Sequence, residues 1–129
     1  MIPSIADAEL EVMRILWREE RPLSFTEIRT ELEDKKKWSK STIQTLVTRL
    51  RDKGAINSHT HYVTLYTHNV TELEYQHAEE KTFLDKLFSG NAKKLVASLC
   101  QSGQLNENDI DELKQFFVME GDNDDCPTL

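Results

Sequence analysis

Near the N-terminus, apolar residues recur three and four positions apart, which is the spacing of one face of an α-helix. They are Ala8, Val12, Ile15 and Leu16. With Trp17 at the end of this stripe, the pattern predicts an amphipathic helix over residues 6–18. Its apolar face is expected to lie in a protein core.

A second helix is predicted by the residues that precede it. Ser24 and Glu27 have the spacing of a capping box. Leu23 and Ile28 have the spacing of a hydrophobic staple across the same helix start. We therefore expect a helix that begins at Phe25 and ends at about Asp34.

A third helix is predicted over about residues 40–53. Ser39 is placed to cap its N-terminus, and Trp38 and Ile43 repeat the staple spacing. Gly54 supplies the stop signal, because glycine is the common residue just after a helix end.

After the third helix the pattern changes to that of β-strands. Residues 55–58 and 62–67 are predicted strands, and residues 59–61 between them are the predicted turn of a hairpin. Three helices followed by a hairpin are the element order of a winged helix-turn-helix domain. The predicted fold is mainly α with a small β hairpin.

The rest of the chain is predicted to be helical, over residues 71–88, 92–101 and about 106–119. The strand pattern gives way to helix near residue 70, where the sign of the charge also changes. We therefore expect a winged-helix DNA-binding domain over residues 1–70, a helical dimerisation domain over residues 71–119 and an acidic, disordered tail over residues 120–129.

The C-terminal helices carry more apolar side chains than three short helices can bury within one subunit. Apolar surface of this kind marks an interface, and most such interfaces join identical subunits. We therefore predict a homodimer held by ten residues: Leu73, Phe83, Leu84, Leu87, Phe88, Leu95, Leu99, Leu113, Phe116 and Phe117.

The composition is that of a water-soluble protein without membrane insertion. The 129 residues are 38% hydrophobic and 30% charged, and no apolar run approaches the roughly 20 residues that cross a bilayer. No signal peptide precedes the first helix, which predicts a cytoplasmic location. Two cysteines are too few for a disulfide framework; Cys100 is expected in a helix core and Cys126 as a tail thiol.

The net charge of −7 is divided unevenly along the chain. Residues 1–70 hold 11 Lys and Arg against 10 Asp and Glu, whereas residues 71–129 hold 5 against 13. Within the first part, residues 35–53 carry seven cations and one acid. Such a concentration suits phosphate, so double-stranded DNA is the predicted partner. The lysine run by itself is equally typical of a solvated basic loop.

The third helix has one apolar stripe, formed by Ile43, Leu46, Val47 and Leu50, and one polar stripe, formed by Ser41, Gln44, Thr45 and Thr48. Hydroxyl and amide groups can contact base edges in the major groove, and flanking cations can contact phosphates. Arg49 could instead pair with an acid of an earlier helix. The predicted DNA-contacting residues are Lys40, Ser41, Thr42, Gln44, Thr45, Thr48, Arg49, Arg51 and Lys53.

An enzyme is not expected. The sequence has no Gly-rich phosphate loop, no nucleophile elbow and no cluster of metal ligands, so neither a cofactor nor a metal is predicted. The alternative function is that of a winged-helix module for protein interaction, whose acidic C-terminal half contacts a basic partner. That alternative predicts no salt-sensitive DNA binding.

Seven segments resemble the penicillinase-repressor family in order and spacing. They are residues 7–13 (DAELEVM), 16–17 (LW), 38–39 (WS), 45–50 (TLVTRL), 53–54 (KG), 83–90 (FLDKLFSG) and 109–113 (DIDEL). The resemblance covers nearly the whole chain up to about residue 118. It implies a repressor that dimerises through intertwined C-terminal helices and binds dyad operators.

The resemblance also implies a route of release from DNA. In β-lactam-responsive relatives, a membrane sensor-transducer triggers proteolysis of the repressor within its dimerisation region. The position that matches the family's Asn-Phe scissile bond is Ser98-Leu99, which departs from that dipeptide. The copper-responsive branch uses paired Cys-x-Cys motifs, which Cys100 and Cys126 do not form.

Other positions depart from the family pattern. Ala6 stands where the family commonly has a serine cap. At the positions of Lys40, Ser41 and Gln44, the resistance repressors of the family instead have Pro, Lys and Arg. The resemblance therefore does not define the operator sequence. The hairpin around residues 59–61 is shorter and less basic than usual, which predicts weak contacts of the hairpin with DNA.

Overall fold

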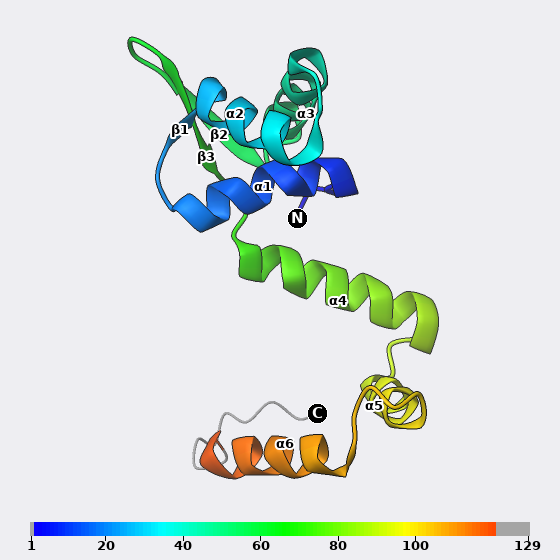
Figure 1. The fold of residues 1–129 in the computed structure, drawn as a ribbon. Helices are drawn as coiled ribbons and strands as arrows, with labels where there is room; N and C mark the ends of the chain where they lie inside the picture. The colour runs from blue at the N-terminus through cyan, green and yellow to red at the C-terminus, as the bar shows by residue number, and fades with distance from the viewer. Residues whose placement is uncertain (1, 121–129) are drawn as a thin grey trace. The chain divides into compact units, whose positions relative to one another are not determined.

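The computed structural model describes residues 2–120, and the rest of the predicted acidic tail, with Cys126, lies outside the described residues (Figure 1). Residue contacts divide the chain into two compact units, which we call the N-terminal unit (up to Ala78) and the C-terminal unit (from Glu79). The proposed domain boundary near residue 70 stays a prediction. The contacts extend the N-terminal unit into the following helix.

The N-terminal unit has the predicted order of helices and hairpin (Figure 1). Its elements are α1 (Asp7–Glu19), β1 (Leu23–Ser24), α2 (Phe25–Lys36), α3 (Lys40–Asp52), β2 (Ile56–Thr60) and β3 (Thr64–His68). The three helices begin and end within two residues of their predicted bounds. This order confirms the mainly α fold class with a winged helix-turn-helix domain.

The hairpin belongs to a three-stranded antiparallel sheet with the strand order β1-β3-β2. β1 was not predicted from the sequence; its residues Leu23 and Ser24 pair with Tyr66 and Leu65. A segment of two residues has no alternating pattern of its own. It becomes a strand only because folding places it beside β3.

The predicted position of the hairpin turn is wrong by two residues. His59 and Thr60 lie in β2, and the turn is formed by residues 61–63, so Tyr62 is in the turn and not in a strand. The hydroxyls of Thr60 and Thr64 lie 2.8 Å apart across the ladder. Strand pairing therefore continues beyond the buried part of the sheet, where the apolar pattern gives no indication of it.

The predicted helix caps are present. Ser24 donates its backbone N–H to Glu27 Oε1 at 3.1 Å, and the N–H of Glu27 donates to Ser24 Oγ at 3.2 Å. Ser39 Oγ accepts from the N–H of Thr42 at 3.2 Å. Gly54 has a φ of +80°, a left-handed conformation that favours glycine, so it directs the chain out of α3 into β2.

The core of the N-terminal unit is formed by apolar side chains from its three helices and its sheet. They include Val12, Met13 and Leu16 on α1, Ile28 and Leu32 on α2, Ile43, Leu46, Val47 and Leu50 on α3, and Ile56 and Tyr66 in the sheet. The predicted apolar stripe of α3 is confirmed. Burial of that stripe determines which face of α3 is open to solvent.

Charged side chains join α1 to α2 at the surface. Arg18 donates to both carboxylate oxygens of Glu31, with a distance of 2.8 Å from Nη1 to Oε2. Lys35 donates to the same carboxylate at 3.0 Å. The hydrogen bonds from Arg18, followed by the one from Lys35, hold the pKa of Glu31 at about 2.

Replacing Glu31 by Gln is expected to lower the midpoint of thermal unfolding at pH 7 and to lower it much less at pH 2. A folded-state pKa below the ordinary value of 4.5 means that the carboxylate stabilises the fold above about pH 4.5. That contribution is lost as the pH falls toward about 2. Melting curves of both proteins across this range test the prediction. A difference as large at pH 2 as at pH 7 would assign the effect to something other than the charge.

The C-terminal unit is helical, as predicted. α4 (Glu72–Phe88) crosses the division between the units and is followed by α5 (Ala92–Gln101) and α6 (Glu107–Glu120). From residue 79 to residue 118, no side chain is buried. None of the helices in the described range has the length and apolar character needed to cross a bilayer.

Candidate nucleic-acid interface

The face of α3 opposite the core is polar and open to solvent. Ser41, Gln44 and Thr45 are exposed and Thr48 is half-buried, so the predicted polar stripe lies on one side of the helix. Gln44 Nε2 donates to Thr48 Oγ1 at 3.3 Å, and Thr45 Oγ1 donates to the carbonyl of Ser41 at 2.9 Å. The Gln44 amide oxygen has no partner among the described residues, so it is available to a donor on another molecule.

The N-terminus of α3 is suited to a negatively charged ligand group. Its first turn contains no acidic residue, whereas α1 has Asp7 and Glu9 and α2 has Glu27 in their first turns. Lys40 occupies the first helical position and is exposed. The partial positive charge of this helix end is therefore reinforced by a side chain and not neutralised by one.

Ion pairs divide the cations of the N-terminal unit into two groups. Of its eleven Lys and Arg side chains, all of them described, eight lie within 4.0 Å of a carboxylate. The other three have no acidic partner in the described part of the chain: Lys37, Lys40 and Arg49. These three lie on α3 or in the turn before it, so the positive charge without a local counterion lies there.

The cations of the predicted basic run thus differ in whether they are paired with a carboxylate, which their sequence does not indicate. Lys35 Nζ lies 3.0 Å from a carboxylate oxygen of Glu31, and Lys36 Nζ lies 3.4 Å from one of Glu11. Arg51 lies 3.6 Å from the exposed carboxylate of its neighbour Asp52, a pair that solvent screens strongly.

The ammonium group of Lys53 is bound to other groups of the protein. It donates to the carboxylate of Glu9 and, at 2.7 Å, to the carbonyl of Ser4. Glu9 is only 2% exposed and also accepts the backbone N–H of Ala6 at 2.8 Å. Lys53 therefore connects the end of α3 to the start of α1, and its charge already has a counterion within the protein.

Lys37 is a candidate phosphate contact that the sequence analysis did not include. It ends α2 in a left-handed conformation with a φ of 58°, and its N–H donates to the carbonyl of Glu33 at 3.2 Å. Its side chain is exposed. The run of three lysines in the sequence indicated a phosphate contact here. Only the ion pairs of Lys35 and Lys36, seen in the structure, distinguish Lys37 from its neighbours.

All ten residues of the predicted dimer interface are solvent-accessible in the single chain. Leu84, Phe88, Leu95 and Leu99 are half-buried, whereas the exposed ones are Leu73, Phe83, Leu87, Leu113, Phe116 and Phe117. Val96 and Val118 are exposed apolar residues that the sequence analysis did not include. The side chains predicted to face a second subunit are thus free to do so.

Ser98 and Leu99, the position that corresponds to the family's scissile bond, lie within α5 and are half-buried. Helical backbone groups are occupied by hydrogen bonds within the helix. A protease that binds an extended substrate would therefore require local unfolding of α5 before cleavage at this bond.

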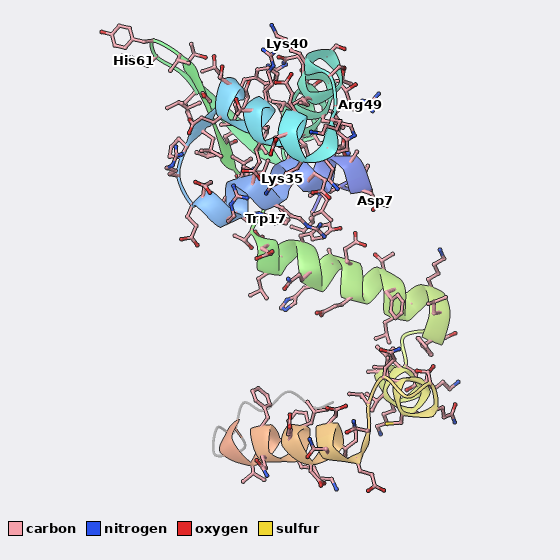
Figure 2. All side chains as sticks on the ribbon, viewed as in Figure 1. Asp7, Trp17, Lys35, Lys40, Arg49 and His61 are labelled. Atoms are coloured by element: carbon pink, nitrogen blue, oxygen red, sulfur yellow. The ribbon has the colours of Figure 1, made fainter. Side chains whose placement is uncertain are left out.

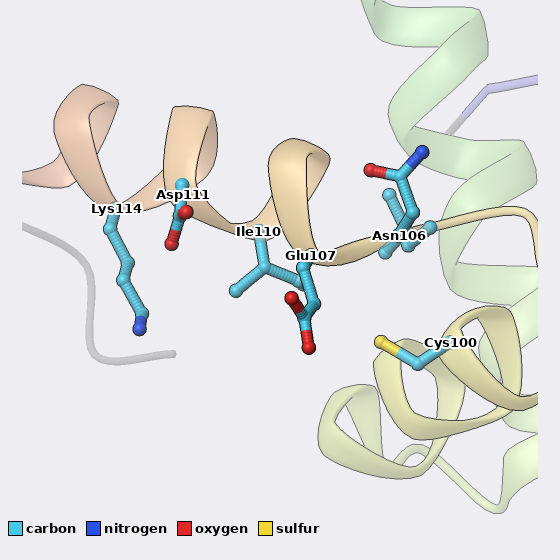
Figure 3. A pocket seen from close by; sticks show the side chains of 7 residues that line it. Cys100, Asn106, Glu107, Ile110, Asp111 and Lys114 are labelled. Carbon is cyan, nitrogen blue, oxygen red and sulfur yellow. The ribbon is translucent and has the colours of Figure 1, made fainter.

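The expectation that Cys100 is a core residue is wrong, because its side chain is exposed on α5. It lines a hollow of about 530 Å³ between α5 and α6, together with Ile110 and Lys114 (Figure 3). Among residues 2–120, no three His, Cys, Asp or Glu side chains are grouped so that they could hold a metal ion.

Lys40 lies at the same end of the N-terminal unit as His61 at the hairpin tip (Figure 2). A third helix with an open polar face, followed by a β hairpin, defines a winged helix-turn-helix protein with an exposed recognition helix. The penicillinase repressor family matches residues 5–118. The chain therefore belongs to this family, which confirms the resemblance in its sequence.

The matches to individual relatives cover almost the same length of this chain as the match to the family. The penicillinase repressor of Bacillus licheniformis is 37% identical over 117 residues, which cover 90% of this chain and 91% of the relative. The methicillin resistance regulatory protein MecI of Staphylococcus aureus (strain N315) is 33% identical over 114 residues, 88% of this chain and 92% of the relative. These relatives are regulators and not enzymes, in agreement with the prediction from the sequence.

Two solved structures are similar to the N-terminal part of the chain. The DNA-binding domain of the repressor BlaI has a TM-score of 0.53 and is 43% identical, over 58% of this chain and 92% of that domain. The monomeric form of Bacillus licheniformis BlaI in complex with the blaP half-operator has a TM-score of 0.52, with the same identity and coverage.

Proposed function

We propose that this chain is a DNA-binding transcriptional repressor that places α3 in the major groove of an operator. The observation that carries the proposal is the position of the cations without a local counterion. All three lie on α3 or in the turn before it, beside a polar helix face. Duplex DNA supplies the missing negative charge, and release of its counterions makes such binding favourable and salt-dependent.

The two kinds of side chain on α3 have different tasks in this proposal. Lys37, Lys40 and Arg49 contact phosphates and set the register of the helix on the duplex. Ser41, Gln44, Thr45 and Thr48 face base edges, where an amide suits adenine and a threonine methyl suits the thymine methyl. Thr42 and Arg51 lie at the margins of this surface and add contacts to the DNA backbone.

The repressor acts as a homodimer on a dyad operator. The C-terminal unit leaves its apolar side chains exposed or half-buried, and no side chain of its described residues 79–118 is fully buried. A second copy of the chain supplies the missing partner surface, as is usual for closed symmetric dimers. Two copies of α3 then contact half-sites a whole number of helical turns apart.

The relatives that are named for penicillinase and methicillin resistance support a role in controlling a β-lactam resistance operon from the cytoplasm. Release from DNA then follows a signal from a membrane sensor-transducer or a protease that acts on the repressor. Cleavage at Ser98-Leu99 would separate α6 from α4, and thereby divide the apolar surface proposed to hold the dimer.

Replacing Lys40 or Arg49 by Ala is expected to weaken binding to all duplexes, and to reduce the slope of log K against log salt by about one unit for each lost phosphate contact. Replacing Gln44 by Ala is expected to cost about 1–3 kcal/mol at the preferred duplex and to leave the slope unchanged. The measurement is a titration at three salt concentrations, with a duplex selected from a random pool by the wild-type chain and a scrambled duplex.

Lys36→Ala is the matched control, because Lys36 belongs to the same basic run but is paired with Glu11. It is expected to leave the slope nearly unchanged. If Lys36→Ala and Lys40→Ala reduce the slope equally, the ion pairs do not select the phosphate contacts. If the wild-type chain shows no salt-dependent binding to any duplex, the protein-interaction module is the better description.

A further inference from the structure

The tip of the β2-β3 hairpin presents an aromatic surface without acidic residues, lysine or arginine to solvent. Tyr62 is 95% exposed and Val63 is 55% exposed. The ring of His61 stands edge-on to that of Tyr62, with 4.6 Å between the ring centroids. Residues 54–70 contain no Lys, Arg, Asp or Glu, so the hairpin has no strongly charged side chain with which to bind a partner.

This surface is held in place from both sides. At the base of the hairpin, Ile56 and Tyr66 are buried in the core of the N-terminal unit. Nearer the tip, Thr60 and Thr64 are joined through their hydroxyls, and the N–H of His61 donates to the carbonyl of Val63 at 3.4 Å. An ordered turn loses less conformational entropy on binding than a flexible loop does.

The hairpin tip and the start of α3 are placed so that one extended ligand could contact both. Figure 2 shows His61 and Lys40, one of the cations without a local counterion, at the same end of the N-terminal unit. A duplex that meets Lys40 at the start of α3 would also pass the tip of the β2-β3 hairpin, which is the wing of this fold. An aromatic ring with a hydroxyl is suited to the wall of a groove, because its face packs on deoxyribose while its hydroxyl stays hydrated or meets a phosphate.

We propose that Tyr62 packs its ring against sugars in the minor groove beside each half-site, and so supplies DNA affinity without charge. This inference rests on the proposed function and deepens it, because it assigns the wing a contact of a different kind from those of α3. Weak contacts of the hairpin with DNA were predicted because the hairpin is shorter and less basic than is usual in the family. An apolar contact does not need basic residues.

The test uses the full chain and the duplex selected from a random pool by the wild-type protein. Tyr62→Ala is expected to weaken binding about tenfold and to leave the salt slope unchanged, because no counterion is released by this contact. Hydroxyl-radical cleavage, which reports the accessibility of sugars in the minor groove, is expected to lose protection beside each half-site. Tyr62→Phe keeps the ring and is expected to retain both the affinity and the protection.

Two controls separate this inference from its alternatives. Because Tyr62 is almost fully exposed, Tyr62→Ala is expected to melt at the wild-type temperature, whereas Lys40→Ala is expected to reduce the salt slope. The inference is overturned if Tyr62→Ala binds within twofold of the wild type, if it changes the salt slope by one unit, or if the footprint is unchanged. A wild-type chain without salt-dependent duplex binding would overturn the proposed function itself.

Discussion

Replacing Phe116 by Glu is expected to convert the proposed dimer into a monomer and to weaken operator binding at least a hundredfold. Phe116 lies on α6 with 57% of its surface exposed, next to the ring of Phe117 at a centroid distance of 5.8 Å. A carboxylate there would have to be desolvated in the interface, which costs several kcal/mol. A monomer also loses the effective concentration that a second half-site provides, which is worth about 10²–10⁴ in affinity.

Sedimentation at micromolar concentration measures the first effect, and titration of the selected duplex measures the second. Gln115→Glu is the matched control, because it adds the same charge at the neighbouring exposed position of α6. It is expected to leave the dimer intact. A dimeric Phe116→Glu protein would show that this face of α6 does not lie in the interface.

Replacing Lys53 by Met is expected to lower the free energy of unfolding by about 2–3 kcal/mol, which corresponds to a fall of about 8–24 °C in melting temperature for a unit of this size. Glu9 is almost completely buried, and the variant removes its cation while it keeps the apolar stem of the lysine. The remaining hydrogen bond from the N–H of Ala6 does not neutralise the carboxylate.

Three comparisons make this prediction decisive. The double variant Lys53→Met with Glu9→Gln is expected to be less destabilised than the sum of the two single variants. Arg51→Met, at the same end of α3 but in an exposed pair, is expected to change stability by no more than about 0.5 kcal/mol. The DNA salt slope of Lys53→Met is expected to equal that of the wild type. A slope reduced by one unit would return Lys53 to the phosphate contacts.

The local structure of this protein was predictable from its sequence because local interactions determine it. Ser24 and Glu27 satisfy each other's backbone groups three positions apart, and Ser39 caps the helix that it precedes. The stripe that includes Ile43 and Leu50 repeats at the helical period, so its burial was also predictable. These features defined the recognition helix and its polar face, which form the greater part of the candidate site.

The tertiary structure decided how the cations and the wing are used, because their contacts join residues that are far apart in the sequence. The partner of Lys53 lies 44 positions away on α1, so no spacing rule could separate this lysine from Lys40. The position of the hairpin turn depends on strand pairing beyond the core, where apolar periodicity no longer applies. That pairing, and not the propensity of Tyr62 for strands, places an exposed ring at the tip of the wing.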